Sequence, residues 1–227
     1  MAVRPVARPS VALLLIDVQK AFTEGSWRAG ISDSEVLPLK QAFEECARLL
    51  SRLDLKKLPI RMTRTPFRGR DFELDDSVSE AVRGEQIAFF IKLSTSAMHS
   101  EGFPGWIQEL LDSEIKTLVI GGCTITSCVR VSSCLTQKSF QNSGLRVVVD
   151  LSLCGARKEN YKKRCPECLA RYLDQRNLYN NSYLSDCNMC KVPGVEMISP
   201  VDLAVQGMRK AGVNVVEKFN WPQDLES

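Results

Sequence analysis

Three strand-like segments of this chain end on residues that could together perform nucleophilic chemistry. The run "LLLI" leads to Asp17, "AFFI" leads to Lys92, and "TLVI" leads into "GGCTITSCVRVSS", which holds Cys123, Cys128 and Cys134. The carboxyl ends of parallel strands face one edge of a sheet, so these groups are expected to meet there. A cysteine that opens a helix at this edge would have its thiolate stabilised by the helix N-terminus and the ammonium, and the carboxylate could take its proton. The set predicts a covalent hydrolase.

Each of these residues also has an ordinary structural explanation when it is taken alone. An Asp after a strand is a common turn former. A Lys at a strand end usually reaches solvent, and cysteine is among the most frequently buried residues. The combination at one sheet edge is what indicates chemistry.

The elements that must position these residues alternate along the chain. Apolar runs of strand length, flanked by segments of helical period, are typical of βαβ units. Strands are predicted at 11–17, 59–65, 87–92, 116–122, 145–152 and 213–218, and helices at 35–57, 105–113 and 127–140. A final helix is predicted from the cap Ser199 and Pro200 to Gly212. These elements predict a three-layer α/β/α fold with a doubly wound, mainly parallel sheet of six strands.

Composition excludes several classes of protein. The chain has 227 residues, 44% of them hydrophobic and 25% charged, which is typical of one soluble globular domain spanning 1–227. The net charge of +3 is too small to indicate a nucleic-acid or membrane partner. No run approaches the roughly 20 apolar residues of a spanning helix. Nine cysteines without an export signal predict reduced thiols and a cytoplasmic location.

The segment 157–197 interrupts the alternation and is predicted to be an insertion. It contains no clear strand, and a short helix is expected within 169–179. Two CxxC pairs, "CPEC" and "CNMC", are separated by 18 residues and supply the four cysteines Cys165, Cys168, Cys187 and Cys190. This spacing predicts a tetrahedral structural zinc site. The alternative is four unrelated buried cysteines.

The role of this insertion is left open by its sequence. It leaves the sheet near the predicted catalytic edge, which favours a lid over the active site or a contact between subunits. The stretch "RKENYKKRCPEC" is basic and carries Tyr161, so nucleic-acid binding by a zinc knuckle is a second interpretation. The absence of a basic stripe elsewhere in the sequence disfavours it.

The three strand-end segments also resemble a known family. In this order, "LLLIDVQKAF", "IKLSTSAM" and "GGCTITSCVRVSS" are similar to the signature segments of isochorismatase-like cysteine hydrolases. These include N-carbamoylsarcosine amidohydrolases and nicotinamidases. The resemblance implies that Asp17 is the general base, Lys92 the active-site lysine and Cys128 the nucleophile. It implies hydrolysis of a carboxamide or ureido C–N bond in a small molecule through a thioester, with release of ammonia, by a homo-oligomer.

The same resemblance implies further site residues. A cis peptide is expected between Cys123 and Thr124, with the side chain of Cys123 buried. The backbone N–H groups of Thr124 and Cys128 would then form the oxyanion hole. Gln19 matches the family's DxQ pattern as a substrate-binding candidate. Arg157, in "CGAR", takes the place of an arginine that holds a substrate carboxylate in some members; the alternative is a surface arginine.

Two other functions remain as alternatives. The isochorismatase-type vinyl-ether hydrolases of the family need the aspartate but not the cysteine, so the complete set of three residues disfavours that reaction. A non-catalytic scaffold or nucleic-acid-binding protein on a hydrolase fold is the other. The single histidine, His99, is expected to be a polar loop residue, which disfavours a metal-dependent nicotinamidase.

Overall fold

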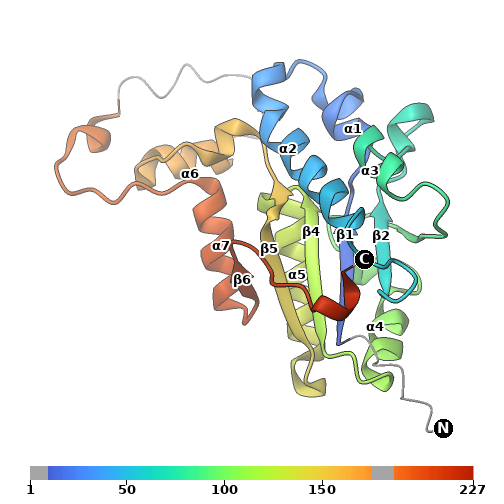
Figure 1. Cartoon of the computed structure of the whole chain (residues 1–227). Helices are drawn as coiled ribbons and strands as arrows, with labels where there is room; N and C mark the ends of the chain where they lie inside the picture. The colour runs from blue at the N-terminus through green and yellow to red at the C-terminus, as the bar shows by residue number, and fades with distance from the viewer. Residues whose placement is uncertain (1–9, 175–186, 227) are drawn as a thin grey trace, which may run out of the picture.

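The computed structural model describes residues 10–174 and 187–226, and these residues form one six-stranded sheet. All its strand pairs are parallel, in the order β3-β2-β1-β4-β5-β6 (Figure 1). The strands are β1 (Val11–Ile16), β2 (Ile60–Arg64), β3 (Ala88–Ile91), β4 (Thr117–Cys123), β5 (Arg146–Gly155) and β6 (Asn214–Val216). All six predicted strands are therefore confirmed.

Helices cover both faces of this sheet, which confirms the predicted three-layer fold. Along β1, Leu13 and Leu15 enter one core cluster, whereas Leu14 and Ile16 enter the other. The first cluster is covered by α1 (Lys20–Thr23), α2 (Asp33–Leu50) and α3 (Asp76–Ala81), and the second by α4 (Phe103–Asp112), α5 (Arg130–Phe140) and α7 (Pro200–Lys210). The remaining helix, α6 (Pro166–Asp174), lies to the side of the carboxyl end of β5 (Figure 1).

Short helical turns connect these elements. They are η1 (Ser26–Arg28), η2 (Gly69–Phe72), η3 (Ala97–His99), η4 (Ile125–Val129), η5 (Gln141–Ser143), η6 (Lys158–Tyr161), η8 (Asn188–Lys191) and η9 (Gln223–Leu225). Among the described helices, none is long and apolar enough to cross a membrane.

The helix α2 ends earlier than its apolar spacing predicts. The helical spacing runs to residue 57, but the helix ends at Leu50. Leu53 and Leu58 are nevertheless buried, because turns after the helix place them in the same core. The N–H of Asp54 donates to the carbonyl of Leu225 at 2.8 Å, which fixes this turn against the C-terminal segment. The predicted helix is therefore wrong beyond Leu50.

The start of α7 is as predicted, and its caps explain why. The N–H of Asp202 donates to Ser199 Oγ at 3.0 Å, and the N–H of Ser199 donates to Asp202 Oδ2 at 3.0 Å. This reciprocal pair is a capping box, and Pro200 follows as the first helical residue.

The predicted insertion precedes this helix. Its described part contains no strand and only an isolated bridge between Arg164 and Ile198. Residues 175–179 of the predicted short helix lie outside the described residues.

The strand order places the ends of β1 and β4 side by side at the middle of the sheet. The chain moves outward from β1 to β3 and then returns to the other side of β1, so this edge is the topological switch point where ligands bind in such folds. Asp17 follows β1 and the cysteine turn follows β4. The predicted meeting of strand ends therefore occurs at the centre of the carboxyl edge.

Gly122 permits this close approach of β4 to β1, and we expect its replacement to be costly. Its φ is +107°, and a Cβ there would lie 2.0 Å from the carbonyl oxygen of Ile16. Gly122→Ala should therefore lower the free energy of unfolding by at least about 3 kcal/mol, measured by urea denaturation. Gly144→Ala is the matched control, because Gly144 has φ +78° and open space around it, so its cost should be about 1 kcal/mol. Equal losses would contradict this explanation.

Candidate active site

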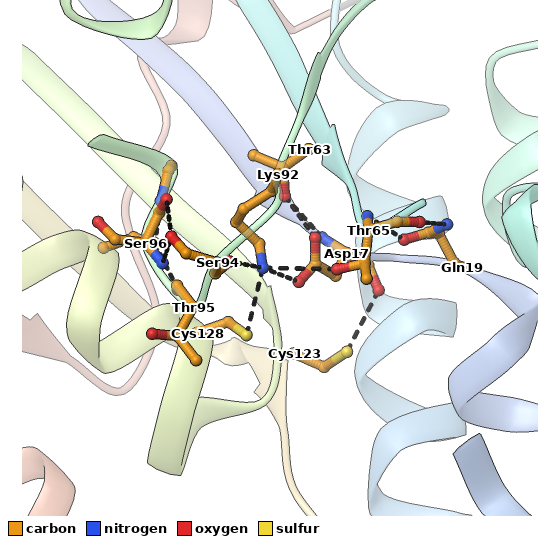
Figure 2. A network of polar contacts seen from close by, with 12 residues as sticks. Asp17, Gln19, Thr63, Thr65, Lys92, Ser94, Thr95, Ser96, Cys123 and Cys128 are labelled. Carbon is orange, nitrogen blue, oxygen red and sulfur yellow. Dashed lines mark hydrogen bonds and ion pairs between the residues drawn. The ribbon is translucent and has the colours of Figure 1, made fainter. Parts of the chain in front are cut away.

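The structure brings the three predicted residues Asp17, Lys92 and Cys128 together (Figure 2). Lys92 Nζ lies 2.9 Å from Asp17 Oδ2 and 3.5 Å from Cys128 Sγ. The side chain of Asp17 is fully buried and that of Lys92 is 2% exposed. A carboxylate, an ammonium and a thiol therefore share one buried site, although they come from segments far apart in the sequence.

Asp17 is held by the neighbouring strand β2. Its φ is +52°, so its backbone is in the left-handed region. The Thr63 hydroxyl donates to Asp17 Oδ1 at 2.7 Å and accepts from the N–H of Asp17 at 3.1 Å. Oδ2 pairs in charge with Lys92 but has no hydrogen-bond partner of good geometry among the described residues. The ammonium therefore holds Oδ2, while the Thr63 hydroxyl holds Oδ1.

Lys92 sits at the end of the edge strand β3 and points inward. Its ammonium donates to the carbonyl of Ser94 at 2.8 Å and lies 3.5 Å from the Thr65 hydroxyl. Burial lowers the pKa of Lys92, but the charges of Asp17 and Cys128 more than offset this, and the net pKa is raised. Lys92 is therefore a cation and a hydrogen-bond donor here, and it does not act as a base.

Cys128 lies in the π-helical turn η4, which continues into α5. Turns of this type often occur at functional sites. Burial raises the pKa of Cys128 and the charge of Asp17 raises it further, while Lys92 lowers it, so that the net direction is upward. The sequence predicted a thiolate stabilised by a helix N-terminus and the ammonium. The structure gives the opposite direction, because desolvation outweighs Lys92.

This direction predicts the pH dependence of Cys128 alkylation. The ordinary pKa of the thiol is 9.0 and the folded value is higher, so the rate of iodoacetamide labelling should still be rising above pH 9. The rate is measured by peptide mass spectrometry, with glutathione as the free-thiol control. A rate that reaches its plateau below pH 8 would contradict this expectation and would mean that Lys92 dominates the site.

The turn between β4 and η4 has the cis peptide that the resemblance implied. The bond between Cys123 and Thr124 is cis. Cys123 is fully buried as expected, and its S–H donates to the carbonyl of Asp17 at 3.2 Å. The carbonyl of Thr124 accepts from the N–H groups of Ser127 and Val129 at 3.0 and 3.1 Å. This turn carries both residues whose N–H groups were predicted to form the oxyanion hole.

Gln19 differs from its predicted role. It is fully buried, and its side-chain amide is bonded to backbone atoms. Nε2 donates to the carbonyls of Thr65 and Phe72 at 3.0 and 3.2 Å, and Oε1 accepts from the N–H of Thr65 at 2.8 Å. The side chain thus ties the end of β1 to the end of β2. It positions Asp17 and has little capacity left for a substrate.

Arg157, the other substrate-binding candidate, is not the surface arginine of the alternative interpretation. It lies two residues after β5 and is 8% exposed. Its Nε is 3.7 Å from Glu35 Oε2, and neither Nε nor Nη1 has a hydrogen-bond partner among the described residues. A buried guanidinium with unused donors is suited to an anion.

Arg157 lines a pocket of about 520 Å³ that reaches the turn between β4 and α5, although Asp17, Lys92 and Cys128 are not among the described residues that line it. Thr124 and Thr126 of that turn form one side, together with Arg130. Other walls come from η1, η6, α6 and α7, and the full lining is Trp27, Thr124, Thr126, Arg130, Arg157, Asn160, Tyr172, Leu173, Pro200, Leu203, Ala204 and Gly207. A larger hollow of about 720 Å³ between α2, α3 and the C-terminal segment contains none of the predicted site residues.

Two further polar residues, Arg64 and His99, have structural partners. Arg64 stacks on Phe89 with its guanidinium carbon 3.7 Å from the ring centre, and it does not line this pocket. His99 is exposed, and its Nδ1 is 3.2 Å from the Ser94 hydroxyl. His99 is therefore the polar loop residue that the sequence predicted.

Comparison with known families places the three residues Asp17, Lys92 and Cys128 within one domain. The isochorismatase domain matches residues 11–165, which is more than half of the chain and includes Asp17, Lys92 and Cys128. The chain belongs to the isochorismatase family. No curated protein matches the chain.

Solved structures of similar fold include a nicotinamidase, a hydrolase of unknown specificity and a ribonuclease. The nicotinamidase of Bacillus subtilis is 12% identical with a TM-score of 0.56, and the match covers 92% of this chain and 99% of that one. YcaC of Escherichia coli, an octameric hydrolase of unknown specificity, is 15% identical with a TM-score of 0.50, covering 94% and 79%. The MAR1 ribonuclease of Caenorhabditis elegans is 15% identical with a TM-score of 0.54, covering 93% and 79%. These likenesses show the fold.

This isochorismatase-family hydrolase also carries the predicted four-cysteine cluster. The sulfur atoms of Cys165, Cys168, Cys187 and Cys190 all lie within 4.8 Å of one another, and the family match ends at the first of them. Three of the S···S distances are 3.5, 3.6 and 3.4 Å. Tetrahedral zinc with Zn–S bonds of about 2.3 Å needs sulfurs about 3.8 Å apart. The arrangement therefore fits a metal ion held by four thiolates.

The polar surroundings of Cys165 fit a metal ligand as well. The N–H of Cys168 donates to Cys165 Sγ at 3.4 Å. Burial raises the pKa of Cys165, but this N–H and the neighbouring thiols outweigh it and lower the pKa to about 7. Metals bind the thiolate form, which such an environment favours.

Several residues of the site could not be identified from the sequence. Thr63, Thr65 and Ser94 hold the buried ion pair, and Tyr172 lines the pocket. The only available signal was a polar residue inside an apolar strand, as in "IRMTR". That signal does not reveal that Thr63 pairs with Ile16 of β1, next to Asp17.

Proposed function

We propose that this isochorismatase-family hydrolase is a cysteine-dependent amidohydrolase. The observation that carries the proposal is the buried ion pair of Asp17 and Lys92, 2.9 Å apart, with Cys128 Sγ 3.5 Å from the same ammonium. A nucleophile, a base and a cation at one sheet edge are the components of covalent acyl transfer. The substrate is a small molecule with a carboxamide or ureido group.

The raised pKa of Cys128 means that the reaction starts from a neutral thiol. Asp17 Oδ2 removes the proton as the sulfur attacks the carbonyl carbon, and the carbonyl oxygen becomes an oxyanion. The N–H groups of Thr124 and Cys128 stabilise this oxyanion; one such donor typically contributes about 2.7 to 4 kcal/mol. Asp17 then returns the proton to the leaving nitrogen, the C–N bond breaks, and ammonia leaves. Lys92 balances the negative charge throughout.

The second half of the reaction uses the same groups. The acyl group is now bound to Cys128 as a thioester. Water attacks this thioester while Asp17 takes one proton from the water. The C–S bond then breaks as that proton returns to the sulfur, and the carboxylic acid product leaves and loses its own proton to solvent. Each step conserves atoms and charge, and no bound metal takes part.

The substrate class is indicated by the pocket beside Thr124. Arg157 and Arg130 both line this pocket and give it positive charge. We propose that the substrate carries a carboxylate which Arg157 binds through two hydrogen bonds. The 520 Å³ volume suits a small metabolite.

We propose zinc as the ion of the four-cysteine cluster. Four thiolates leave no open coordination position, so the ion would supply structural rigidity and no catalytic chemistry. All nine cysteines are free thiols, which fits a reducing compartment such as the cytoplasm. A homo-oligomer is also proposed, in line with the octamer described for YcaC.

The test is a search for ammonia release from small carboxamides and ureido acids, with the protein quenched in acid during turnover. The expected result is an acyl adduct on Cys128 in the intact mass spectrum and its absence in Cys128→Ala. Cleavage of a vinyl ether without any adduct would instead support the isochorismatase-type reaction. Binding to RNA that weakens with salt, with no ammonia release, would support the non-catalytic alternative.

A further inference from the structure

The pocket beside Thr124 has walls from two helices that lie beyond the family match, α6 and α7. Tyr172 and Leu173 line it from α6, and α6 lies beyond residue 165, where the family match ends. The other lining residues on the nucleophile side, Thr124, Thr126 and Arg157, lie within the matched residues. The cysteine insertion therefore supplies one wall of this pocket.

The helix α6 connects the cysteine cluster directly to this wall. Cys165 immediately precedes the helix and Cys168 lies in its first turn, whereas Tyr172 and Leu173 lie in its last turn. Tyr172 is four residues after Cys168, so both side chains lie on the same face of the helix. A fixed Cys168 sulfur thus fixes the face that carries the Tyr172 ring.

Contacts at the base of the insertion hold Tyr172 in place. The Arg164 guanidinium carbon lies 4.1 Å from the centre of the Tyr172 ring, and the Tyr172 hydroxyl donates to Asn160 Oδ1 at 2.9 Å. Arg164 is itself buried and paired with Glu159 at 2.5 Å. Burial raises the pKa of Tyr172 and the nearby charges of Arg157 and Arg164 lower it, with a net upward direction. The phenol is therefore neutral and can donate a hydrogen bond.

In the described part of the insertion, the apolar cluster around the cysteines is small. The buried cluster around the cysteines consists of Cys165, Cys168 and Cys187, with Val195 partly buried against it. The helix has nine residues, and isolated helices shorter than about 12 to 15 residues are marginal in water. A metal bound by four thiolates would supply the missing stabilisation, since its binding free energy acts as folding free energy.

The catalytic residues, in contrast, are independent of the insertion. The contacts of Asp17, Lys92 and Cys128 described above come from β2, the end of β3 and the turn after β4. Loss of the metal would leave this buried ion pair intact. It would expose Arg157 to water, and an exposed cation attracts an anion much less than a buried one.

We infer that the four-cysteine metal site determines substrate selectivity, because it holds Tyr172 and Leu173 as one wall of the pocket that Arg157 shares with Thr124, in the turn that carries Cys128. With the metal bound, the pocket favours molecules that carry a carboxylate. Without it, Cys128 remains reactive but no longer distinguishes anionic from neutral molecules. This inference rests on the proposed function of Cys128 as a nucleophile that faces the pocket.

The test uses two alkylating reagents of similar size, iodoacetate with a carboxylate and iodoacetamide without one. The rate of Cys128 modification by each is measured by peptide mass spectrometry at pH 8.5 in the zinc-loaded protein. The ratio of the two rates cancels the intrinsic reactivity of the thiol and reports the anion preference of the pocket. The protein stripped by a chelator, Tyr172→Ala and Arg157→Ala are measured in the same way, and circular dichroism checks that each keeps its fold.

We expect the ratio of iodoacetate to iodoacetamide rates to fall at least about fivefold after zinc removal, in Tyr172→Ala and in Arg157→Ala. Tyr161→Ala is the matched control, because Tyr161 belongs to the same insertion but does not line this pocket; its ratio should be unchanged. An equal ratio in all forms, with Cys128 still labelled, would overturn this inference and leave the proposed function intact. If neither reagent labelled Cys128 in any form, the proposed function itself would fail.

Discussion

Cys128→Ala should reduce amide hydrolysis by at least about 10⁴-fold without unfolding the protein. The reason is that the thioester cannot form without the sulfur, while the buried pair of Asp17 and Lys92 remains. The measurement is kcat for ammonia release from the best carboxamide or ureido substrate, together with the thermal midpoint of unfolding. The side chain of Cys128 is only partly buried, so its loss leaves a small cavity.

Cys134→Ala is the matched control for this experiment. Cys134 lies on α5, six residues after Cys128, and is also partly buried against the same core cluster. Its replacement should change kcat by less than about twofold, because it does not contact the ion pair. Full amide hydrolysis by Cys128→Ala, with complete loss of activity in Asp17→Asn, would contradict covalent catalysis by Cys128. That outcome would fit a reaction that needs only the aspartate, as vinyl-ether hydrolysis does.

Lys92→Met should abolish activity and lower the free energy of unfolding by about 3 to 5 kcal/mol. Asp17 is fully buried and Lys92 is its partner at 2.9 Å, so methionine would leave an uncompensated charge inside the protein. Urea denaturation at pH 7 measures this loss. Since the pKa of Lys92 is raised above its ordinary 10.5, the stabilisation by the pair is present below that pH and is lost as the pH rises through the folded pKa.

A double variant separates the electrostatic explanation from simple loss of packing. Asp17→Asn combined with Lys92→Met removes both charges and should regain most of the stability that Lys92→Met loses, while it stays inactive. If the double variant were as unstable as the sum of the two single variants, the charges would not interact. A loss of less than about 1 kcal/mol in Lys92→Met would show that Asp17 has other compensation.

The sequence by itself determined the strands and predicted the three residues that meet at the candidate site. Apolar runs of strand length predicted all six strands; the central strands β1 and β4 are buried on both faces and are therefore almost entirely apolar. The two CxxC pairs predicted the cysteine cluster, since their spacing brings thiols together whatever the rest of the fold does. The resemblance of three short segments selected Cys128 among three nearby cysteines and implied the cis peptide that the structure contains.

The tertiary structure decided how these residues behave. Strand register brought the Thr63 hydroxyl within hydrogen-bond distance of the Asp17 carboxylate. Burial raised the pKa of Cys128, whereas the sequence predicted a stabilised thiolate. The side-chain amide of Gln19 is hydrogen-bonded to backbone atoms, and Tyr172, which belongs to the cysteine insertion, lines the pocket. Desolvation and through-space contacts depend on which segments meet, and local sequence does not contain that information.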